Sequence, residues 1–348
     1  RDAFIKKIWE WKEDSGGTIT NQSKRLGTSC DWKRERFTKD QGLNKAVIKV
    51  FNDLYNAGLI YRDKRLVNWD TKFQTAISDL EVQQVETEGN LWYINYYFKD
   101  DSNKYITVAT TRPETLLGDT AVAVNPEDER YFNLIGKTLI VPIVNREIKI
   151  ISDEYAKLGE GTGAVKITPA HDFNDFEVGK RHQLEFINIL DEFAKINENA
   201  PKRFQGLDRF DARKLILEEL TQLGLLIKEE KQQMVIPYGD RSGVVIEPWL
   251  TDQWFCNAKK LAIDPIKSVK ENITTFVPKN WENTFFNWME NIQPWCISRQ
   301  LWWGHQIPAW YGPDNKSFVA LSIDEAKLMA KNHYGKEVEL KQDEDVLD

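Results

Sequence analysis

The sequence of 348 residues is poor in the side chains that form disulfides or bind transition metals. It has four histidines and three cysteines, and the cysteines lie far apart without a C-x-x-C pair. This spacing excludes the common zinc signatures and a disulfide framework, and it favours a reducing compartment. We therefore expect a cytoplasmic protein.

The chain also lacks long apolar runs, a signal-peptide-like amino end, internal repeats and low-complexity tracts. No apolar stretch approaches the ~20 residues that a membrane-spanning helix needs. The formal net charge is −7, so no global positive field indicates nucleic acid, although a few placed Lys or Arg would suffice to bind phosphate. With 41% hydrophobic and 29% charged residues, the composition is that of a globular protein of two or more domains.

Hydrophobic periodicity predicts helices towards both ends of the chain and strands in its middle. Helical spacing begins at Phe4 and is expected to stop at Gly16-Gly17, and a second helix is expected over 44–57, ending at Gly58. Further helices are predicted over 172–182, 210–223, 257–269 and 281–292. Strands are predicted over 66–69, 91–98, 105–109, 121–124, 139–144, 148–151, 164–168, 186–190 and 244–247, with a hairpin turn at Asn145-Arg146.

This order of elements predicts three segments. Several short strands with few helices favour a compact, barrel-like mixed β domain over residues 83–235. Residues 1–82 and 236–348 are richer in helix, and we expect them to form two parts of one α/β domain around that insertion. The chain begins without Met and ends without a closing helix, so we also expect a piece of a longer protein.

The stretch 161–175 carries the strongest candidate site. Alternation along its strand places Lys166 and Thr168 on one face. Pro169 ends the strand, and Asp172 is a plausible N-cap of the following helix. Asp175 lies about one turn further on, so both carboxylates project to the same side. The set suits a small zwitterionic ligand, but a surface strand, turn and helix with a solvated ion pair fits the spacing equally well.

A second polar loop, Thr110-Thr111-Arg112-Pro113-Glu114-Thr115, directly follows a predicted strand. Its hydroxyls and guanidinium can bond a ribose, a phosphate or a carbonyl oxygen. The alternative is a turn whose threonines cap backbone groups. The pair His171-Asp172 is also found in metal phosphohydrolases of the His-Asp kind, but that chemistry needs more ligands and only His182 is near.

Aromatic residues gather in the last part of the chain. Trp295, Trp302, Trp303 and Trp310 lie within one stretch of 16 residues, 295–310. Such density is typical of a core or of a ligand wall, and the sequence leaves both interpretations open.

Five stretches resemble the valyl-tRNA synthetases: 65–70, 110–120, 161–182, 237–254 and 295–308. The resemblance runs from end to end. It implies a Rossmann-type class I synthetase catalytic domain, split by an inserted β-barrel-like editing domain, and hence an α/β and α+β fold. Isoleucyl and leucyl enzymes share this layout but typically place His or Met where Lys166 stands. Lys166, Thr168 and Asp172 together look like the valyl pattern, and an isoleucyl or leucyl editing domain stays the alternative.

The resemblance also implies a function and a set of site residues. The whole enzyme would ligate valine to tRNA(Val), and the inserted domain would hydrolyse threonyl-tRNA(Val), because a valine pocket cannot strongly reject threonine. Asp175 would hold the substrate's α-ammonium, and Asp172 with Lys166 and Thr168 would read the threonine hydroxyl. A positioned water would attack, with Lys166 stabilising the oxyanion. Substrate-binding positions by the same resemblance are Thr110, Thr111, Arg112, Glu114, Thr115 and His171.

The resemblance further implies cofactors and partners. Editing would need no metal. The whole enzyme would use ATP with Mg, but signatures of the HIGH and KMSKS kinds are absent from these residues, so we do not expect this chain to charge tRNA. The expected partners are the acceptor end of tRNA(Val) and valine or threonine, with no membrane, for a monomeric protein. The alternative from another class is a non-catalytic module that only binds the acceptor end.

Overall fold

The computed structural model describes residues 1–348 and divides them into two compact units. One unit is continuous, Lys64–Asp252, and the other combines Arg1–Asp63 with Gln253–Asp348. The chain passes between the units within strand β1 (Ile60–Asp70) and again within β10 (Glu247–Cys256). One unit is thus inserted in the sequence of the other. The division into 1–82, 83–235 and 236–348 stays a prediction.

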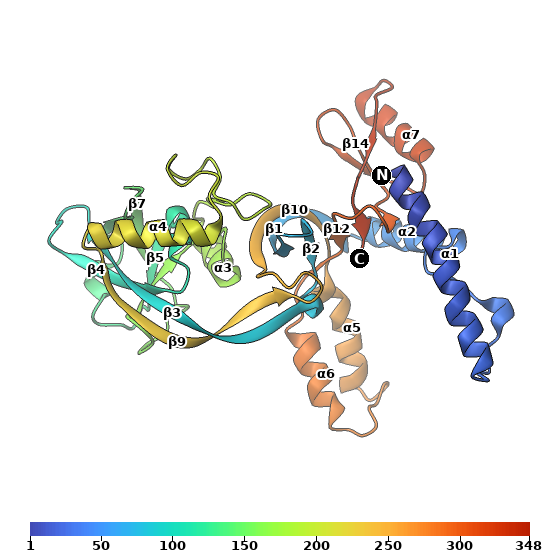
Figure 1. The fold of residues 1–348 in the computed structure, drawn as a ribbon, viewed down its shortest axis with the longest axis horizontal. Helices are drawn as coiled ribbons and strands as arrows, with labels where there is room; N and C mark the ends of the chain where they lie inside the picture. The colour runs from blue at the N-terminus through green and yellow to red at the C-terminus, as the bar shows by residue number, and fades with distance from the viewer. The chain divides into compact units, whose positions relative to one another are not determined.

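The unit of residues 64–252 is built on a seven-stranded mixed sheet (Figure 1). Six strands follow the order β4-β3-β6-β7-β5-β8, and β9 pairs with β3. The only parallel pair is β5 with β7. The strands are β3 (Val82–Phe98), β4 (Tyr105–Thr110), β5 (Ala121–Val124), β6 (Thr138–Ile140), β7 (Glu147–Ser152), β8 (Ala164–Ile167) and β9 (Leu226–Gly239).

Alternating burial shows why these sequences form a one-sided sheet. In β3, Ile94, Tyr96 and Phe98 face the main core, at 5% exposure or less. Helix α4 (Arg209–Gln222) packs Ala212, Ile216 and Leu220 into the same cluster. Burial of each large apolar side chain contributes about 1.5–3 kcal/mol. Helix α3 (Phe173–His182), the 3₁₀ helices η2 (Asp79–Glu81), η3 (Pro113–Gly118) and η4 (Phe132–Leu134), and β2 (Thr75–Ile77) complete the unit.

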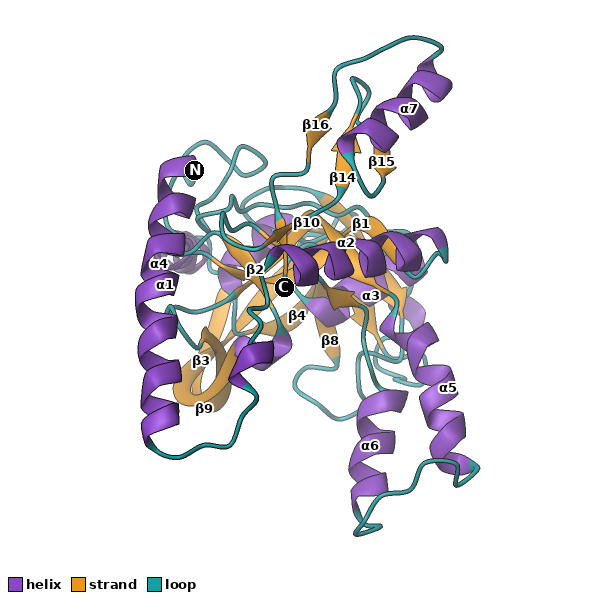
Figure 2. Ribbon diagram, turned by 90° about the vertical axis from the view of Figure 1, so that its right-hand side faces the viewer, coloured by secondary structure: helices purple, strands orange, loops and turns teal.

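The other unit is richer in helix. It contains α1 (Asp2–Arg25), η1 (Trp32–Arg34), α2 (Gln41–Asn56), α5 (Ala258–Lys270), α6 (Trp281–Glu290) and α7 (Ile323–Tyr334). Helices α5 and α6 lie side by side as a hairpin (Figures 1 and 2). Short strands form two three-stranded sheets: β12 (Ser298–Arg299), β17 (Val346–Leu347) and β13 (His305–Gln306), and β15 (Ser317–Val319), β14 (Ala309–Tyr311) and β16 (Lys341–Gln342). Strand β11 (Trp295–Cys296) pairs with β10.

Most predicted helices are confirmed, but the predicted stop at Gly16-Gly17 is wrong. Helix α1 runs through both glycines to Arg25. Glycine costs only about 1 kcal/mol in a helix interior, which is not enough to end it. The helix ends before Gly27, whose φ of +78° is the left-handed conformation that stops a helix.

Three predicted strands differ from the structure, and the first of them, 139–144, ends already at Ile140 in β6. Residues 186–190 form no strand, and only Leu190 makes an isolated bridge, to Ile196. The apolar run that predicted a strand reflects burial, since Ile189 and Leu190 are at most 1% exposed in a loop. Residues 244–246 also lie outside a strand, because β10 begins only at Glu247.

The hairpin at Asn145-Arg146 is confirmed, but its loop is longer than two residues. Strand β6 ends at Ile140 and β7 begins at Glu147. Ile143 and Asn145 both adopt positive φ, of +67° and +55°, and these two residues turn the chain.

The sequence left open whether the tryptophan-rich segment 295–310 forms a core or a ligand wall, and its tryptophans differ in burial. Trp310 is 6% exposed and belongs to a small core with Phe318 and Ala326. Trp295 and Trp302 are 50% and 55% exposed. The segment is therefore partly core and partly surface. No helix of the chain is long and apolar enough to cross a membrane.

Candidate functional site

The two predicted polar stretches lie together in the unit of residues 64–252. Strand β8 ends at Ile167, and Asp172 caps α3, accepting hydrogen bonds from the backbone N–H of Asn174 and Asp175 at 2.8 and 3.0 Å. The predicted N-cap is confirmed. The Arg112 Nη1 donates to the His171 carbonyl oxygen at 2.7 Å, so the loop after β4 contacts the turn before α3.

Lys166 is the centre of a buried hydrogen-bonded group. Its Nζ lies 2.8 Å from Thr115 Oγ1, 3.0 Å from Asp119 Oδ1 and 2.5 Å from Thr168 Oγ1. The last contact confirms that the side chains of Lys166 and Thr168 point to the same side, although β8 ends at Ile167 and Thr168 lies one residue beyond it. The Lys166 and Asp119 side chains are 8% and 0% exposed, so this ion pair is not a solvated surface pair.

Asp119 accepts hydrogen bonds from three side chains. Its Oδ1 also accepts from Thr168 Oγ1 at 2.5 Å, and its Oδ2 accepts from the Tyr96 hydroxyl at 2.6 Å. Burial raises the pKa of Asp119 above its ordinary value, and the charge of Lys166 opposes that effect. Burial and the neighbouring Asp119 carboxylate raise the pKa of Tyr96, so its phenol keeps its proton.

Asp175 lies beside this group on α3. Its Oδ2 accepts a hydrogen bond from the Thr168 backbone N–H at 2.8 Å, and the residue is 5% exposed. Burial, followed by the negative charge of Asp172, raises the pKa of Asp175 to about 7. A cation bound here would favour the ionised carboxylate and relieve this cost.

The loop after β4 serves partly to cap its own backbone, as one interpretation predicted. Thr110 Oγ1 accepts from the Arg112 backbone N–H at 3.1 Å, and Thr115 Oγ1 donates to the Arg112 carbonyl at 2.9 Å. Thr111 is half-buried. The threonine hydroxyls therefore fix the backbone of the residue that carries the guanidinium.

A buried ionic network holds Arg112 and Glu114 in place. Arg213 bonds both Glu114 oxygens at 2.7 and 2.8 Å, and Arg112 pairs with Glu247. Arg209 bonds the other Glu247 oxygen at 2.7 Å. Burial opposes ionisation of Glu114, yet Arg213 and Arg112 hold the pKa of Glu114 below its ordinary value.

His171 has one ring nitrogen bonded and one without a partner. The backbone N–H of Ile189 donates to His171 Nε2 at 3.0 Å, so the neutral ring carries its hydrogen on Nδ1. Nδ1 is buried and has no hydrogen-bond partner. Burial, with the charges of Arg112 and Lys166, lowers the pKa of His171 well below its ordinary value. The ring is thus a neutral donor held next to the candidate site.

Asp119 and Tyr96 were not predicted as site residues, nor were the supporting Arg209, Arg213 and Glu247. Asp119 stands in the apolar surroundings of a 3₁₀ turn, without spacing that links it to Lys166. Only the pairing of β5 with β8, which sets Ala121 opposite Ile167, brings them together. The signals available in the sequence were the carboxylate itself, in an otherwise apolar stretch, and its place in the stretch 110–120 that carries the resemblance.

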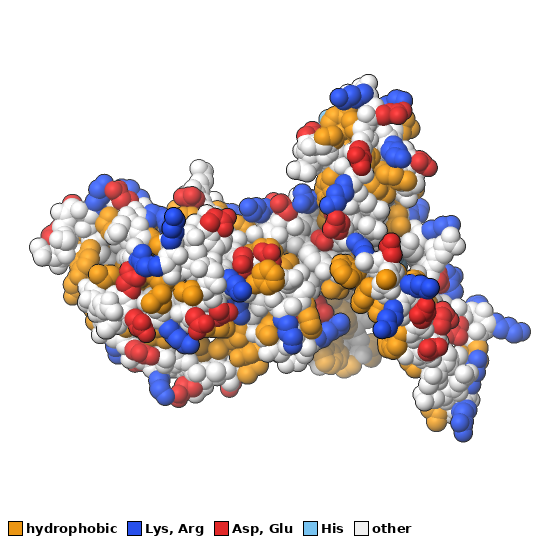
Figure 3. Space-filling model, turned by 45° about the horizontal axis from the view of Figure 1, so that its top comes forward, with side chains coloured by type: hydrophobic (Ala, Val, Ile, Leu, Met, Phe, Trp, Pro, Cys, Tyr) orange, Lys and Arg blue, Asp and Glu red, His pale blue; other side chains and the backbone are white.

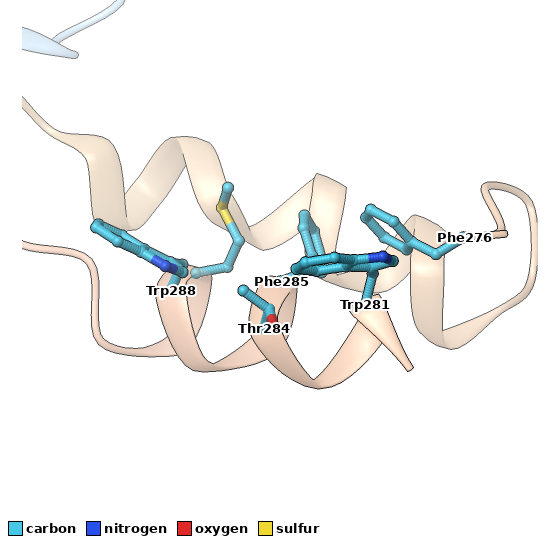
Figure 4. Close-up of a pocket in the computed structure, with 6 residues that line it drawn as sticks. Phe276, Trp281, Thr284, Phe285 and Trp288 are labelled. Atoms are coloured by element: carbon cyan, nitrogen blue, oxygen red, sulfur yellow. The ribbon is translucent and has the colours of Figure 1, made fainter. Parts of the chain in front are cut away.

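Other parts of the chain offer less chemistry. No group of three or more His, Cys, Asp or Glu side chains is placed to hold a metal ion, and His182 bonds Asp153 at 2.9 Å. An apolar pocket of about 340 Å³ lies on the α5–α6 hairpin, lined by Phe276, Trp281, Thr284, Phe285, Trp288 and Met289 (Figure 4). It holds no ionisable side chain. Acidic and basic side chains alternate over the face seen in Figure 3, without a large patch of one sign.

Comparison with known proteins defines the class. Residues 1–348 match the family model of the class I tRNA synthetases (I, L, M and V), and the chain belongs to this family. The resemblance to valyl-tRNA synthetases is confirmed by its relatives. The chain is 60% identical to the valine–tRNA ligase of Pelagibacter ubique over 348 residues, which are 100% of this chain and 40% of that protein.

Two further valine–tRNA ligases give the same result. The enzyme of Rhodopseudomonas palustris is 59% identical over 96% of this chain and 37% of that protein. The enzyme of Caulobacter vibrioides is 56% identical over 100% of this chain and 40% of that protein. The chain thus spans about 40% of the length of these curated relatives. A LeuRS–tRNA–LeuAMS complex of Agrobacterium radiobacter K84 aligns with 97% of this chain and 46% of that chain at 16% identity and a TM-score of 0.36, a likeness too low to define a shared fold.

Proposed function

We propose that this chain carries the hydrolytic editing site of a valine–tRNA ligase, which removes threonine from threonyl-tRNA(Val). The observation that carries the proposal is the buried group of Lys166, Asp119 and Thr168 next to Asp175, in a chain 60% identical to a valine–tRNA ligase. Lys and Asp side chains are rarely buried this deeply, and clusters of buried, interacting ionisable groups are more frequent at functional sites than elsewhere.

The chemistry explains why such a site is needed. A pocket for valine rejects threonine only weakly, since the two side chains have nearly the same shape. A second site that hydrogen-bonds the threonine hydroxyl excludes valine, because valine leaves the polar groups of that site unpaired.

The proposed roles follow the position of each residue. Asp175 binds the α-ammonium, a role supported by its raised pKa and its place beside Asp172. Asp172, Lys166 and Thr168 read the side-chain hydroxyl. The remaining positions, which border the terminal adenosine and the ester, are Thr110, Thr111, Arg112, Glu114, Thr115 and His171. Glu114 acts by holding Arg112 and Arg213.

The wider activity is part of the same proposal. The whole protein ligates valine to tRNA(Val) with ATP and Mg, and residues 1–82 and 236–348 belong to its catalytic domain. Nothing in residues 1–348 gathers a set of metal-binding side chains, so none is assigned to Mg. Hydrolysis uses an attacking water and no cofactor. The protein acts in the cytoplasm as a monomer that binds the tRNA acceptor end.

The test measures release of threonine from threonyl-tRNA(Val), with valyl-tRNA(Val) as the control substrate. The wild-type chain should release threonine selectively. Asp175→Ala should slow that release by about 100-fold or more, because the ammonium loses its charged partner. Asp211→Ala, which removes an exposed carboxylate on α4, is the matched control and should keep the wild-type rate.

Binding of the acceptor end without any release of threonine would contradict hydrolysis and leave an acceptor-end binding module. Selective release of an amino acid from tRNA specific for isoleucine or leucine would instead indicate the editing domain of an isoleucyl or leucyl enzyme.

A further inference from the structure

The short 3₁₀ helix η3 carries one of the contacts of Lys166 and is buried along its whole length. Thr115 lies within η3, and its Oγ1 is 2.8 Å from Lys166 Nζ. All six residues of η3, Pro113–Gly118, are buried. The last carbonyl groups of a helical turn have no partner inside the helix, and a buried carbonyl group without a partner is costly. The end of η3 therefore needs a donor from another part of the chain.

Arg146 supplies that donor from the loop between β6 and β7. Its Nη1 donates to the carbonyl oxygens of Leu117 and Asp119 at 3.1 and 3.0 Å. One guanidinium nitrogen, which carries two hydrogens, thus joins two carbonyl groups at the end of η3. A cation is favourable at this end of a helical turn because the carbonyl groups there carry a partial negative charge.

The loop that carries Arg146 has a strained backbone and is closed by its own hydrogen bonds. Ile143 has a φ of +67°, which is an outlier for a β-branched residue. The Asn145 N–H donates to the Val141 carbonyl oxygen at 3.0 Å, and the Val141 N–H donates to the Arg146 carbonyl oxygen at 2.8 Å. The side chain of Ile143 packs against the main core. Strain of this kind persists only where the surroundings fix the backbone, so the loop is a rigid base for Arg146.

The end of η3 also packs against the residues that follow β8. A Cβ at Gly118 would lie 2.8 Å from the Ile187 carbonyl oxygen and 3.2 Å from Thr168 Cγ2. There is thus no space for a methyl group between η3 and Thr168. Closely packed groups transmit displacement, so a movement of η3 would shift both Thr115 and Thr168 relative to Lys166.

We propose that Arg146 is a positioning residue of the proposed site, because it clamps the carbonyl groups at the end of η3 and thereby holds Thr115 in place beside Lys166. The inference rests on the proposed function and deepens it. Arg146 acts through the backbone of η3 and takes no part in the hydrolytic step. The sequence presents this residue only as part of a hairpin turn.

The test measures single-turnover release of threonine from threonyl-tRNA(Val) by variants of the whole chain. Arg146→Ala leaves two carbonyl groups without their donor and frees the end of η3, so the rate should fall about tenfold or more. Arg146→Lys keeps a cation that can donate to both carbonyl groups, and its rate should stay within about threefold of wild type. Arg203→Ala is the matched control, since the Arg203 guanidinium pairs with Glu219, and it should keep the wild-type rate.

Rescue by free guanidinium separates a positioning role from a merely structural one. Guanidinium ion, added below the concentrations that unfold the chain, can enter the space left in Arg146→Ala and bond the same two carbonyl groups. The rate of this variant should rise saturably towards wild type, and sodium chloride at equal ionic strength should give no rise. Because guanidinium destabilises folded proteins, such a rise cannot come from refolding. A loss of rate that guanidinium does not relieve would overturn the inference.

Amide hydrogen exchange separates this inference from the proposed hydrolysis. The Asp119 N–H donates to the Leu116 carbonyl oxygen at 3.1 Å, at the end of η3. Its exchange should become about tenfold faster in Arg146→Ala and stay unchanged in Arg203→Ala. If Arg146→Ala does not fold, Arg146→Met, which fills the space without a donor, takes its place in the rate and exchange measurements.

The outcomes for the function and for the inference differ. Release of threonine by the wild-type chain, with both rate and exchange unchanged in Arg146→Ala, would overturn the inference and leave the function. A wild-type chain that releases no threonine would contradict the function, while the exchange at Asp119 would still decide whether Arg146 fixes η3.

Discussion

Asp175 lies in a position that disfavours the negative charge of its carboxylate. Its carboxylate is 5% exposed and lies near the negative charge of Asp172, and these two effects raise its pKa to about 7. The folded chain therefore binds a proton at Asp175 between about pH 4 and pH 7, where the unfolded chain does not. The stability that this proton contributes is complete below pH 4 and is lost as pH rises through 7.

Asp175→Asn should accordingly stabilise the fold above pH 7. The amide oxygen can keep the hydrogen bond from the Thr168 backbone N–H, and the buried negative charge is gone. Urea melts at pH 4, 6 and 8 measure the effect: the gain over wild type should be near zero at pH 4 and reach up to a few kcal/mol at pH 8, since one pKa unit corresponds to about 1.4 kcal/mol. A gain that does not change with pH would contradict this. Threonine release should be lost at every pH, a trade of function for stability.

The sequence predicted the site residues that lie close together in the chain better than those that come from distant segments. Asp172, Lys166 and Thr168 lie close in the chain, where cap and alternation rules apply, and their placement is confirmed. Asp119 and Tyr96 approach Lys166 only through sheet pairing between distant segments. Local periodicity carries no information on such pairings, so these residues could not be assigned.

At the scale of elements, the space around a glycine shows whether its helix is closely packed or open to solvent at that point. Helix α3 passes so near the end of β8 that a Cβ at Gly179 would lie 2.7 Å from Pro169 Cβ and 2.8 Å from its Cγ. By contrast, nothing lies within 4 Å of a Cβ at Gly16 or Gly17 in α1. The same substitution should therefore have opposite effects in the two helices.

Gly179→Ala should destabilise the fold by about 1–3 kcal/mol through overpacking, less the helix-propensity gain of about 1 kcal/mol. It should also slow threonine release, because α3 carries Asp175 and its displacement moves the carboxylate. Gly17→Ala is the matched control and should stabilise by about 0.5–1 kcal/mol without changing the rate. Thermal melts and single-turnover rates of both variants measure this, and a Gly179→Ala variant as stable as Gly17→Ala would contradict the close packing.

Strand β9 is a long element that the sequence did not predict. Its exposed part, which contains Lys228-Glu229-Glu230-Lys231, has charges on both faces and so no alternation. Its register is set by its partner, with thirteen residues of β3 paired from Val82 opposite Gly239 to Ile94 opposite Leu226. Helix α4 was predictable by comparison, because its core residues recur at helical spacing and Gly224 follows its end.

At the scale of the whole molecule, the unit of residues 64–252 contains complete cores of its own. Ala170 and Phe176 pack against Leu66 and Leu250, all within this unit. Arg112 and Arg209 share Glu247, which also lies within it. An excised chain of residues 64–252 should therefore fold cooperatively and keep the proposed hydrolysis.

A shorter chain of residues 83–235, the span predicted for the insertion, lacks Leu66, Leu250 and Glu247. Removal of Glu247 leaves the buried Arg209 without its carboxylate, and breaking a buried pair in this way costs about 3–5 kcal/mol. The shorter chain should melt at a lower temperature than 64–252 and release threonine more slowly, because Arg112 loses the same partner. Glu247→Gln in the 64–252 chain removes the charge of Glu247 but keeps the core residues Leu66 and Leu250. It should reproduce part of the decrease in melting temperature and in the rate of threonine release. Equal melting temperatures and rates for the two excised chains would show that residues 83–235 suffice, and that the contacts with Glu247, Leu66 and Leu250 add nothing to the site.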